Sequence, residues 1–364
     1  MNIKTLTTYD VYNYGASLQA YALQTHLTQL GHVVEIINYQ PEYLTRKYNY
    51  HWVNPESKMS RNALTRTIYR TLKFLQRQTT LGRKHKFDYF NHQVLQETPQ
   101  VYYTYEELSA NPPKADLYIV GSDQIWNVFY ETGRDKAFYL DFVKQGRKAS
   151  YAASFSYLDI DDDNLKRISK SLQTFSGVSV RESHGIPLLQ KMGIQGTWVL
   201  DPVFLLDEEM WKKQMVSFDR KESYLLVYDF EGNESMKTFC INYARKHDLK
   251  IYAIVDTYPL RYADKNFKSA GPQEFLTLIY HCDAFVSNSF HGTVFSIIFN
   301  KPVFVFNRHR HKVNSRMESL LGLFGLSACL EPQDDYSFDW GKVNQIRLNE
   351  RQKSIAYLQS ILAV

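Results

Sequence analysis

Cysteine is scarce in this sequence of 364 residues: the three copies, Cys240, Cys282 and Cys329, lie far apart and form no CxxC pair. This spacing argues against a disulfide framework and against a structural zinc site, and we expect no bound metal. Long apolar runs are also missing, because no stretch approaches the roughly 18 residues that a membrane span needs. The first residues lack an apolar run of signal-peptide length as well. We therefore expect a cytoplasmic protein.

Acidic residues are almost absent from one segment of the chain. Between Arg46 and Lys86, Glu56 is the only acid among many basic residues, although the net charge of the whole chain is only +5. A solvated basic helix face would explain this composition. A surface for phosphate groups would explain it equally well, whether on a membrane or on a lipid-diphosphate acceptor.

Strand and helix signals alternate along most of the sequence. Apolar residues recur at helical spacing from Gly15 until Gly31 ends the pattern. Short apolar strand candidates, each followed by a turn, lie at 3–9, 33–39, 116–122, 148–154, 177–183, 197–202, 224–230, 250–256, 284–287 and 302–306. This alternation is typical of parallel sheets covered by helices.

The length of the chain favours two domains. A charged interval at 206–223 interrupts the alternation, and we interpret it as a helix plus an interdomain connection. We predict an α/β fold with two doubly wound, Rossmann-like domains, 1–206 and 223–348, that face a cleft. A C-terminal helix at 349–362 is expected to pack back on the first domain.

Neither GxGxxG nor GxxxxGK[ST] occurs, so no dinucleotide or P-loop motif directs attention to one turn. Doubly wound sheets bind ligands where strands end and helices begin, which makes the strand-end turns the candidates. In the first turn, Asn13 and Gly15 stand just before a helix whose free N–H groups can hold an anion. Asn and Gly also favour ordinary turns, and that alternative stays open.

The second turn reads GSDQIWN, at 121–127. Ser122 and Asp123 can cap a helix, and Trp126 offers a flat face to a sugar or a base. A simple N-cap is the alternative reading of Asp123. The third turn, SVRES at 179–183, contains Arg181 at the end of a buried strand, where an unpaired charge is costly. A ligand phosphate or carboxylate suits a guanidinium, and a structural ion pair is the alternative.

The fourth turn lies within SNSFHGTVFSI, at 287–297. If Ser289 caps the following helix, His291 falls in its first turn, where the helix dipole disfavours the imidazolium. A largely neutral histidine there can exchange protons near physiological pH. Gly292 is expected to leave room for a ligand. A structural histidine is the alternative.

The fifth turn follows the last strand candidate and reads NRHRHKVNSR, at 307–316. Arg308, Arg310 and Arg316 belong to this cationic loop, which is expected at the same sheet edge as His291. It is either solvated surface or a phosphate or diphosphate site. Arg316, on the rising edge of a helix, is the strongest single candidate within it.

Several of these strings together resemble the polysaccharide pyruvyl transferase family. The likeness runs from about Thr7 to Leu321 and rests on YNYGASLQAYAL, GSDQIWN, SVRE, DPVFLL and SFHGTVFSIIFNKPV. It implies a fold like that of two-domain GT-B glycosyltransferases and transfer of a pyruvyl group from phosphoenolpyruvate to two sugar hydroxyls, as a ketal. Such enzymes modify exopolysaccharides, capsules or cell-wall polymers. Phosphoenolpyruvate is then a co-substrate, and no cofactor or nucleic acid is expected.

The resemblance also implies residue roles. His291 matches the family's acid or base, and Arg181 matches an arginine assigned to the donor's phosphate or carboxylate. Ser289 departs from the pattern, because some members carry an arginine at that place, and a replacement charge is expected from Arg308, Arg310 or Arg316. Asp123 is the candidate for a second proton-transfer group. The first domain is the expected acceptor side, with a lipid-diphosphate- or nucleotide-linked sugar contacting Asn13, Gly15, Ser122 and Trp126.

Two other functions fit the same architecture, because fold does not imply function. A glycosyltransferase with a nucleotide-sugar donor would use a carboxylate such as Glu274 to bind ribose. A non-catalytic component of a polysaccharide assembly complex would dock through the basic segment 46–86. That segment is also the candidate for peripheral contact with the inner face of the membrane.

Overall fold

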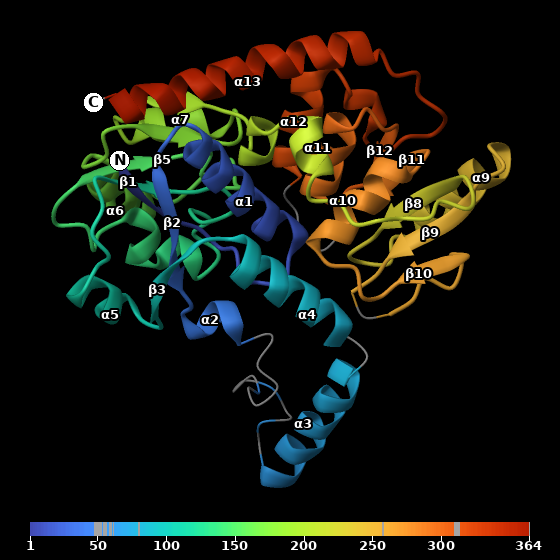
Figure 1. Cartoon of the computed structure of the whole chain (residues 1–364), viewed down its shortest axis with the longest axis horizontal. Coiled ribbons are helices and arrows are strands. Elements are labelled where there is room, and N and C mark those ends of the chain that lie inside the picture. The colour runs from blue at the N-terminus through green and yellow to red at the C-terminus, as the bar shows by residue number, and fades with distance from the viewer. Residues whose placement is uncertain are drawn as a thin grey trace.

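The protein contains two parallel sheets that lie side by side (Figure 1). The computed structural model describes residues 1–46, 53, 57, 60, 62–78, 81–256, 258–308 and 314–363. The first sheet has the strand order β3-β2-β1-β4-β5, and the second has the equivalent order β10-β9-β8-β11-β12. The winding direction reverses between β1 and β4 in the first sheet and between β8 and β11 in the second. Doubly wound sheets bind ligands at such a reversal.

The first sheet comprises β1 (Asn2–Leu6), β2 (Val33–Tyr39), β3 (Glu97–Tyr102), β4 (Leu117–Val120) and β5 (Arg147–Ser150), and a short pair, β6 (Val178–Val180) and β7 (Gly196–Trp198), continues beyond it. The helices in this part are α1 (Tyr14–Gln29), α2 (Glu42–Thr45), α3 (Ala63–Gln78), α4 (Leu81–Tyr89), α5 (Tyr105–Ala110), α6 (Asp162–Leu172) and α7 (Gly185–Lys191). Strand β4 is buried along its whole length, as a central strand covered on both faces requires.

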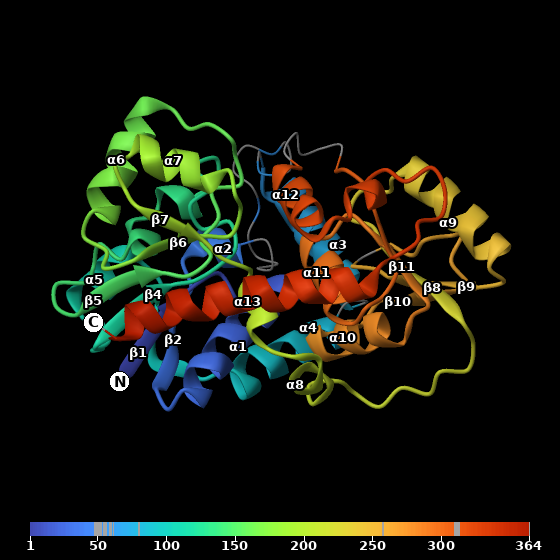
Figure 2. The ribbon, with the colours of Figure 1, turned by 90° about the horizontal axis from the view of Figure 1, so that it is seen from above.

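The second sheet comprises β8 (Tyr224–Tyr228), β9 (Lys250–Ile254), β10 (Lys265–Phe267), β11 (Ala284–Ser287) and β12 (Val303–Val305). Its helices are α9 (Glu234–Lys246), α10 (Pro272–His281), α11 (Phe290–Ile298) and α12 (Ser315–Phe324), and α8 (Glu208–Lys212) lies in the connection between the sheets. The last helix, α13 (Trp340–Ala363), has 24 residues and runs across both parts (Figure 2). Its final turns pack Tyr357, Leu358 and Ile361 on the first sheet.

The predicted α/β class with two doubly wound sheets is confirmed. Strand β3 was not predicted, because its sequence, ETPQVY, includes a proline and exposed polar residues, as edge strands do. The strand predicted at 197–202 ends at Trp198, because Asp201 turns the chain into a short 3-10 helix at Pro202–Leu205. None of the helices in the described ranges combines the length and hydropathy needed to cross a bilayer.

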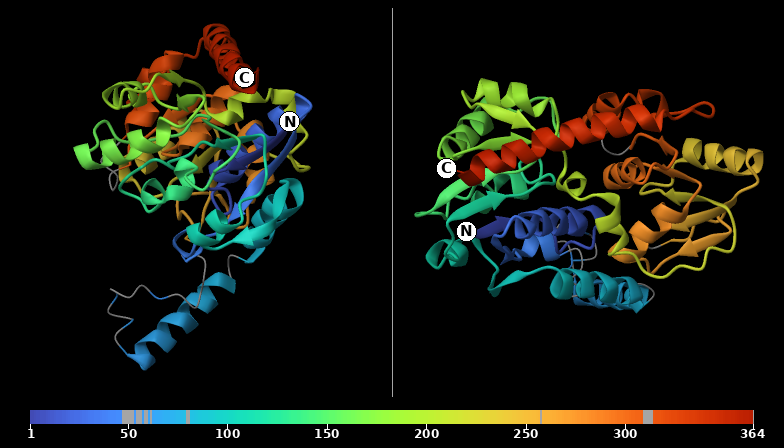
Figure 3. Two further views of the ribbon diagram at one scale, coloured as in Figure 1. Left: turned by 90° about the vertical axis from the view of Figure 1, so that its left-hand side faces the viewer. Right: turned by 45° about the horizontal axis from the view of Figure 1, so that its top comes forward.

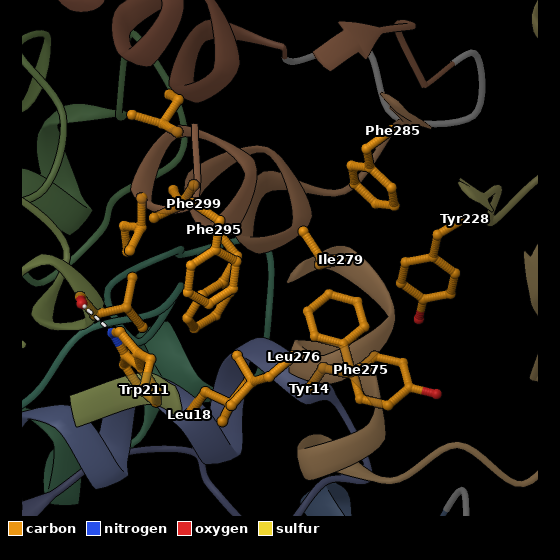
Figure 4. Close-up of a cluster of buried hydrophobic side chains, with 14 of the residues drawn as sticks. Tyr14, Leu18, Trp211, Tyr228, Phe275, Leu276, Ile279, Phe285, Phe295 and Phe299 are labelled. Carbon is orange, nitrogen blue, oxygen red and sulfur yellow. Dashed lines mark hydrogen bonds between the residues drawn. The ribbon is translucent and has the colours of Figure 1, made fainter. Parts of the chain in front are cut away.

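The two halves are joined by an apolar core around the start of α1 (Figure 4). The ring of Tyr14 stacks on Phe275 of α10, with centroids 4.4 Å apart and planes 6° from parallel. Trp211 packs edge-on against Phe295 of α11 at 4.9 Å. The first helix of one domain therefore forms part of the core of the other, which fixes the strand-end turns of both sheets next to each other.

We expect the variant Phe275→Ala to lower the free energy of unfolding by about 3–5 kcal/mol, because a completely buried aromatic ring leaves a cavity between the domains. Urea denaturation followed by tryptophan fluorescence measures the change. Phe129→Ala is the matched control, since Phe129 is 58% exposed and its loss is expected to cost about 1 kcal/mol or less. Equal losses in the two variants would contradict this account of the interdomain core.

Candidate active site

A pocket of about 120 Å³ lies between the two sheets, at the turns that follow β1, β4 and β11. Six of the residues predicted for a site line it, from both domains: Asn13, Asp123, Ser289, His291, Arg308 and Arg316. Parallel strands of each sheet end at this edge, so helix starts and strand-end side chains converge here. The pocket matches the cleft expected from the sequence.

His291 occupies the first turn of α11, as the sequence predicted. The Ser289 hydroxyl caps this helix by accepting a hydrogen bond of 3.2 Å from the Gly292 backbone N–H. The His291 residue is only 7% exposed. Its ring crosses to the first domain and lies against Gly15 of α1, where an added Cβ would overlap the imidazole, Nδ1 above all. Gly15 is therefore required so that the histidine can approach the start of α1.

Asp201 holds the other edge of the imidazole, and sequence reasoning did not select it as a site residue. Its Oδ2 lies 3.3 Å from His291 Nε2 and 2.8 Å from Arg181 Nη1. The same oxygen accepts a hydrogen bond of 3.0 Å from Ser122 Oγ, and Oδ1 accepts one of 3.1 Å from the Val203 N–H. The Asp201 side chain is completely buried. The one signal in the sequence was its place in DPVFLL, a string that carried the family resemblance.

The buried Asp201 carboxyl lies next to two basic side chains. Burial alone would raise its pKa, but the nearby charges of His291 and Arg181 and the hydrogen bond from Arg181 outweigh burial and hold the pKa well below its usual range. A carboxylate of this kind orients a histidine ring and fixes which nitrogen carries the proton. Nε2 is buried on the Asp201 side, where it meets the carboxylate as an ion pair at 3.3 Å and has no hydrogen-bond partner within the described ranges. Nδ1 lies on the side of the ring that faces Gly15.

Arg181 forms the structural ion pair that stood as the alternative to a ligand contact. Its side chain is 1% exposed, pairs with Asp201 and lies over the Phe290 ring at 4.6 Å. Nε and Nη2 are buried without a hydrogen-bond partner in the described part of the chain, and Nη2 is 3.6 Å from Asp123 Oδ1. The guanidinium therefore has donors to spare, and it lines a small neighbouring cavity together with Arg316.

Asp123 does not cap a helix, so the simple N-cap reading of this residue is wrong. No helix begins after it, and its backbone has a φ of 73°, in the left-handed region. Its carboxylate is 22% exposed and lines the pocket, with the Thr8 hydroxyl 3.4 Å away. Non-glycine residues in this conformation cost energy and occur often at functional sites.

Arg316 is the least compensated cation at the pocket. Its guanidinium lies over the Phe290 ring at 5.7 Å, and no carboxylate of the described residues forms an ion pair with it. Burial and then the nearby charge of Arg181 lower its pKa to about 10. Arg308 also lines the pocket but is paired with Glu231 at 3.2 Å. Arg310, with the rest of 309–313, lies outside the described residues.

The ligand contacts predicted for two residues, Trp126 and Gly292, are wrong, and two further residues, Asn13 and Ser122, have structural contacts that the sequence did not predict. Trp126 is completely buried against Tyr139 and donates its N–H to Phe138 O, so it offers no face to a sugar. Gly292 leaves no room for a ligand, because a Cβ there would lie 2.6 Å from the Phe285 ring. The Asn13 side chain caps α1 by accepting from the Ala16 N–H, and Ser122 is buried behind Asp201.

A tyrosine-lined groove continues from the pocket over the first domain. A cavity of about 240 Å³ shares Asp123 with the pocket and is lined by Tyr43 and Tyr130. A further cavity of about 520 Å³ shares Tyr43 and adds Tyr39, Tyr103 and Tyr105. Aromatic rings with hydroxyls suit a ligand that has both apolar faces and polar edges. Within the described ranges, no group of three or more His, Cys, Asp or Glu side chains is arranged to hold a metal ion.

Comparisons with known proteins agree on family and fold. A family model described as polysaccharide pyruvyl transferase matches residues 13–310. No curated protein matches the chain. A UDP-GlcNAc 2-epimerase from Neisseria meningitidis, solved with UDP-GlcNAc, superposes with a TM-score of 0.50 at 11% identity, covering 99% of this chain and 94% of that one. The corresponding epimerase from Methanocaldococcus jannaschii gives 0.49 at 11%, covering 95% and 91%.

A spinosyn forosaminyltransferase gives a TM-score of 0.41 at 9% identity, covering 99% of this chain and 94% of that one. The likeness to the first epimerase concerns the fold alone. Together with the two equivalent strand orders, it identifies a GT-B-like architecture of two Rossmann-like domains that face a cleft.

We expect Arg181→Met to lower the free energy of unfolding at pH 7 by about 3–5 kcal/mol, because it leaves Asp201 buried without its cation. The pKa of Asp201 is depressed in the folded chain, so the pair contributes fully above about pH 4 and its contribution is lost as the pH falls further. The difference between variant and wild type should therefore shrink in acid. Urea unfolding at several pH values measures it.

Two further variants test this assignment. The double variant Arg181→Met/Asp201→Asn should be more stable than Arg181→Met alone, since it removes the uncompensated charge. Arg220→Met is the control, because Arg220 and Asp283 form a pair that is 35% exposed on each side and is expected to contribute about 1 kcal/mol or less. A loss in Arg181→Met that is the same at every pH would show that packing, and not the ion pair, is responsible.

Proposed function

The chain belongs to the polysaccharide pyruvyl transferase family, and we propose that it moves a pyruvyl group from phosphoenolpyruvate to a sugar of a cell-surface or exopolysaccharide precursor, forming a ketal. The observation that carries this proposal is that His291, in contact with Asp201, shares one interdomain pocket with Arg316, which forms no ion pair among the described residues. A proton-transfer group and an anion-binding group are what this donor needs at close range.

Phosphoenolpyruvate carries a phosphate and a carboxylate, and the second domain offers matching charges. Arg316 and Arg308 line the pocket, and the N-terminal turn of α11 adds its backbone N–H groups and the positive end of its dipole. Arg316 supplies the charge that Ser289 lacks relative to some family members. The spare donors of Arg181 stand one layer behind the pocket, where the charge of this arginine is balanced by nearby carboxylates such as Asp201.

The reaction balances without an external oxidant or reductant. The methylene carbon of the donor takes up a proton and becomes a methyl group, while one sugar hydroxyl bonds to the adjacent carbon. A second hydroxyl then bonds to the same carbon, and the C–O bond to phosphate breaks. One hydroxyl proton ends on the methyl group and the other leaves with inorganic phosphate.

His291 is proposed to carry the proton in the first of these steps. The contact between Asp201 and Nε2 holds the ring in place at the wall of the pocket, from which the imidazole is proposed to exchange the proton with substrate. Asp201 is a positioning residue in this scheme, since it contacts the histidine and not the pocket. Asp123, exposed to the pocket from the first domain, is the proposed partner for the second hydroxyl.

The acceptor is proposed to lie on the first domain, along the tyrosine-lined groove. Tyr43 and Tyr130 line its nearer part, and their rings suit the apolar faces of a sugar. In the farther part Tyr39 and Tyr43 donate hydrogen bonds to the Asp135 carboxylate at 2.6 and 2.5 Å, which fixes their rings. A lipid-diphosphate- or nucleotide-linked saccharide longer than one sugar would occupy such a groove.

The nucleotide-sugar alternative loses its candidate ribose ligand. The Glu274 carboxylate caps α10 through the Gly271 N–H at 3.0 Å and pairs with Lys86 at 2.5 Å. It lies outside the lining of the pocket that contains His291. Binding of a uridine or guanosine nucleotide sugar, with no effect of phosphoenolpyruvate, would nevertheless restore that alternative. Full cellular function in a His291→Ala strain would favour the non-catalytic role.

Calorimetric titration with phosphoenolpyruvate is the first test. We expect Arg316→Gln to weaken donor binding by about 10- to 100-fold, because a charge-assisted contact contributes about 1.5–3 kcal/mol. The control is Arg245→Gln, which removes an exposed arginine from α9 of the same domain and should leave affinity unchanged. Phosphate release on addition of lipid- or nucleotide-linked sugars completes the assay. Absence of donor binding both with and without acceptor would exclude pyruvyl transfer.

We expect Gly15→Ala to reduce the rate of phosphate release by about 100-fold or more while donor affinity changes little. The added methyl group overlaps the His291 ring, and displacement of a catalytic group by about 1 Å costs a factor of this size. Single-turnover kinetics separate the two quantities. Gly322→Ala is the control, because its position on α12 has room for a Cβ. Unchanged turnover in Gly15→Ala would remove His291 from the proposed mechanism.

A further inference from the structure

Helix α3 stands away from both sheets. In Figures 1 and 3 it points out from the body of the molecule, beyond α4. It belongs to the basic segment 46–86, of which residues 47–52, 54–56, 58–59, 61 and 79–80 lie outside the described residues. A helix of 16 residues is about 24 Å long, and one that leaves the core needs another partner for any apolar face.

One face of α3 carries exposed apolar side chains. Leu64, Ile68 and Leu72 are spaced by four residues, so they lie on one side of the helix over consecutive turns. They are 70%, 46% and 57% exposed. Single exposed apolar residues are ordinary on protein surfaces, but a continuous row on one helix marks an interaction surface.

The opposite face of α3 is cationic. Arg66, Arg70 and Lys73 recur at helical spacing there, and the sequence of the helix, ALTRTIYRTLKFLQRQ, contains no Asp or Glu. Arg66 and Arg70 are exposed. A helix with an apolar row and an acid-free cationic face is the pattern of helices that lie in the interface of an anionic bilayer.

We propose that α3 docks this protein on an anionic lipid surface. Leu64, Ile68 and Leu72 enter the boundary between headgroups and acyl chains, and Arg66, Arg70 and Lys73 attract the lipid phosphates. The cations lie across the helix from the apolar row. The helix is about 10 Å wide, which is close to the screening length at physiological salt, so the cations still attract the lipid phosphates from there. Their long side chains also reach past the backbone toward the headgroups.

The charge and the size of the surface favour lipid over a second copy of the chain. Packing two apolar rows together would make no use of the cationic faces. Three side chains on one helix also present far less than the roughly 800 Å² per partner that a stable dimer buries. A bilayer needs no shape complementarity, and it uses both faces of the helix.

Co-sedimentation with vesicles tests the docking with the full chain. We expect wild-type protein to bind vesicles that contain phosphatidylglycerol, to bind neutral phosphatidylcholine vesicles weakly, and to be released by salt. The variant Leu64→Gln/Ile68→Gln/Leu72→Gln should reduce binding at least tenfold, and glutamine preserves helix propensity. The matched control replaces three exposed apolar residues of the body, Val33, Leu158 and Leu348, by glutamine and should bind as wild type does.

A second pair of variants tests the charges. Arg66→Gln/Arg70→Gln/Lys73→Gln should lose the preference for anionic vesicles, whereas replacing the exposed Lys166, Lys170 and Lys213 by glutamine should not. Circular dichroism and the donor titration verify that the variants are folded. Failure of the wild type to bind anionic vesicles at low salt would overturn the proposal. The proposal would also be overturned if the triple glutamine variant of α3 bound vesicles as well as the triple glutamine control on the body. A change in oligomeric state that depends on α3 and occurs without lipid binding would overturn it too.

Discussion

The buried carboxylate of Asp201 is the constraint on which the rest of the site depends. A charge without solvent contact is stable only when several partners surround it, and here these come from four places in the chain: Ser122, Arg181, the Val203 N–H and His291. Three of them belong to the first domain and the fourth to the second. The same carboxylate that holds the strand-end residues of the first domain together therefore also contacts the histidine across the cleft, so that the fold and the candidate site share one interaction.

The start of α1 supplies the second contact between the domains. Tyr14 is buried against Phe275, and the adjacent Gly15 lies against the His291 ring. In this one helical turn, Tyr14 packs into the core of the second domain, and Gly15, which has no side chain, leaves the space that the His291 imidazole occupies. The N-cap residues of α1 and α11, Asn13 and Ser289, both line this pocket, so two helices begin at its wall. The apolar core thus determines where the polar groups meet.

Sequence reasoning found features that depend on neighbours along the chain and missed those that depend on contacts across it. The strand-end turns and the Ser289 cap follow from local spacing, and the structure has both. The partner of Arg181 was not predicted, because Asp201 follows a different strand and only β6–β7 pairing brings the two together. The predicted ligand contacts of Trp126 and Gly292 were wrong for a related reason. A strand-end turn places a residue near the edge of the sheet, but the surroundings of that residue depend on rings from other parts of the chain, such as Tyr139 and Phe285.

The charges of the pocket are divided between the domains. The first domain contributes the Asp123 carboxylate to the lining, with Asp201 behind it, and the second contributes His291, Arg308 and Arg316. Under the proposed function, an anionic donor would be attracted to the second domain, and a sugar hydroxyl that must lose a proton would find a carboxylate on the first. In the proposed reaction the bond forms at the boundary between them, where Asp201 already links the two sides through His291. The division of charge is thus the basis for proposing that donor and acceptor bind on opposite walls of the pocket, with His291 between them.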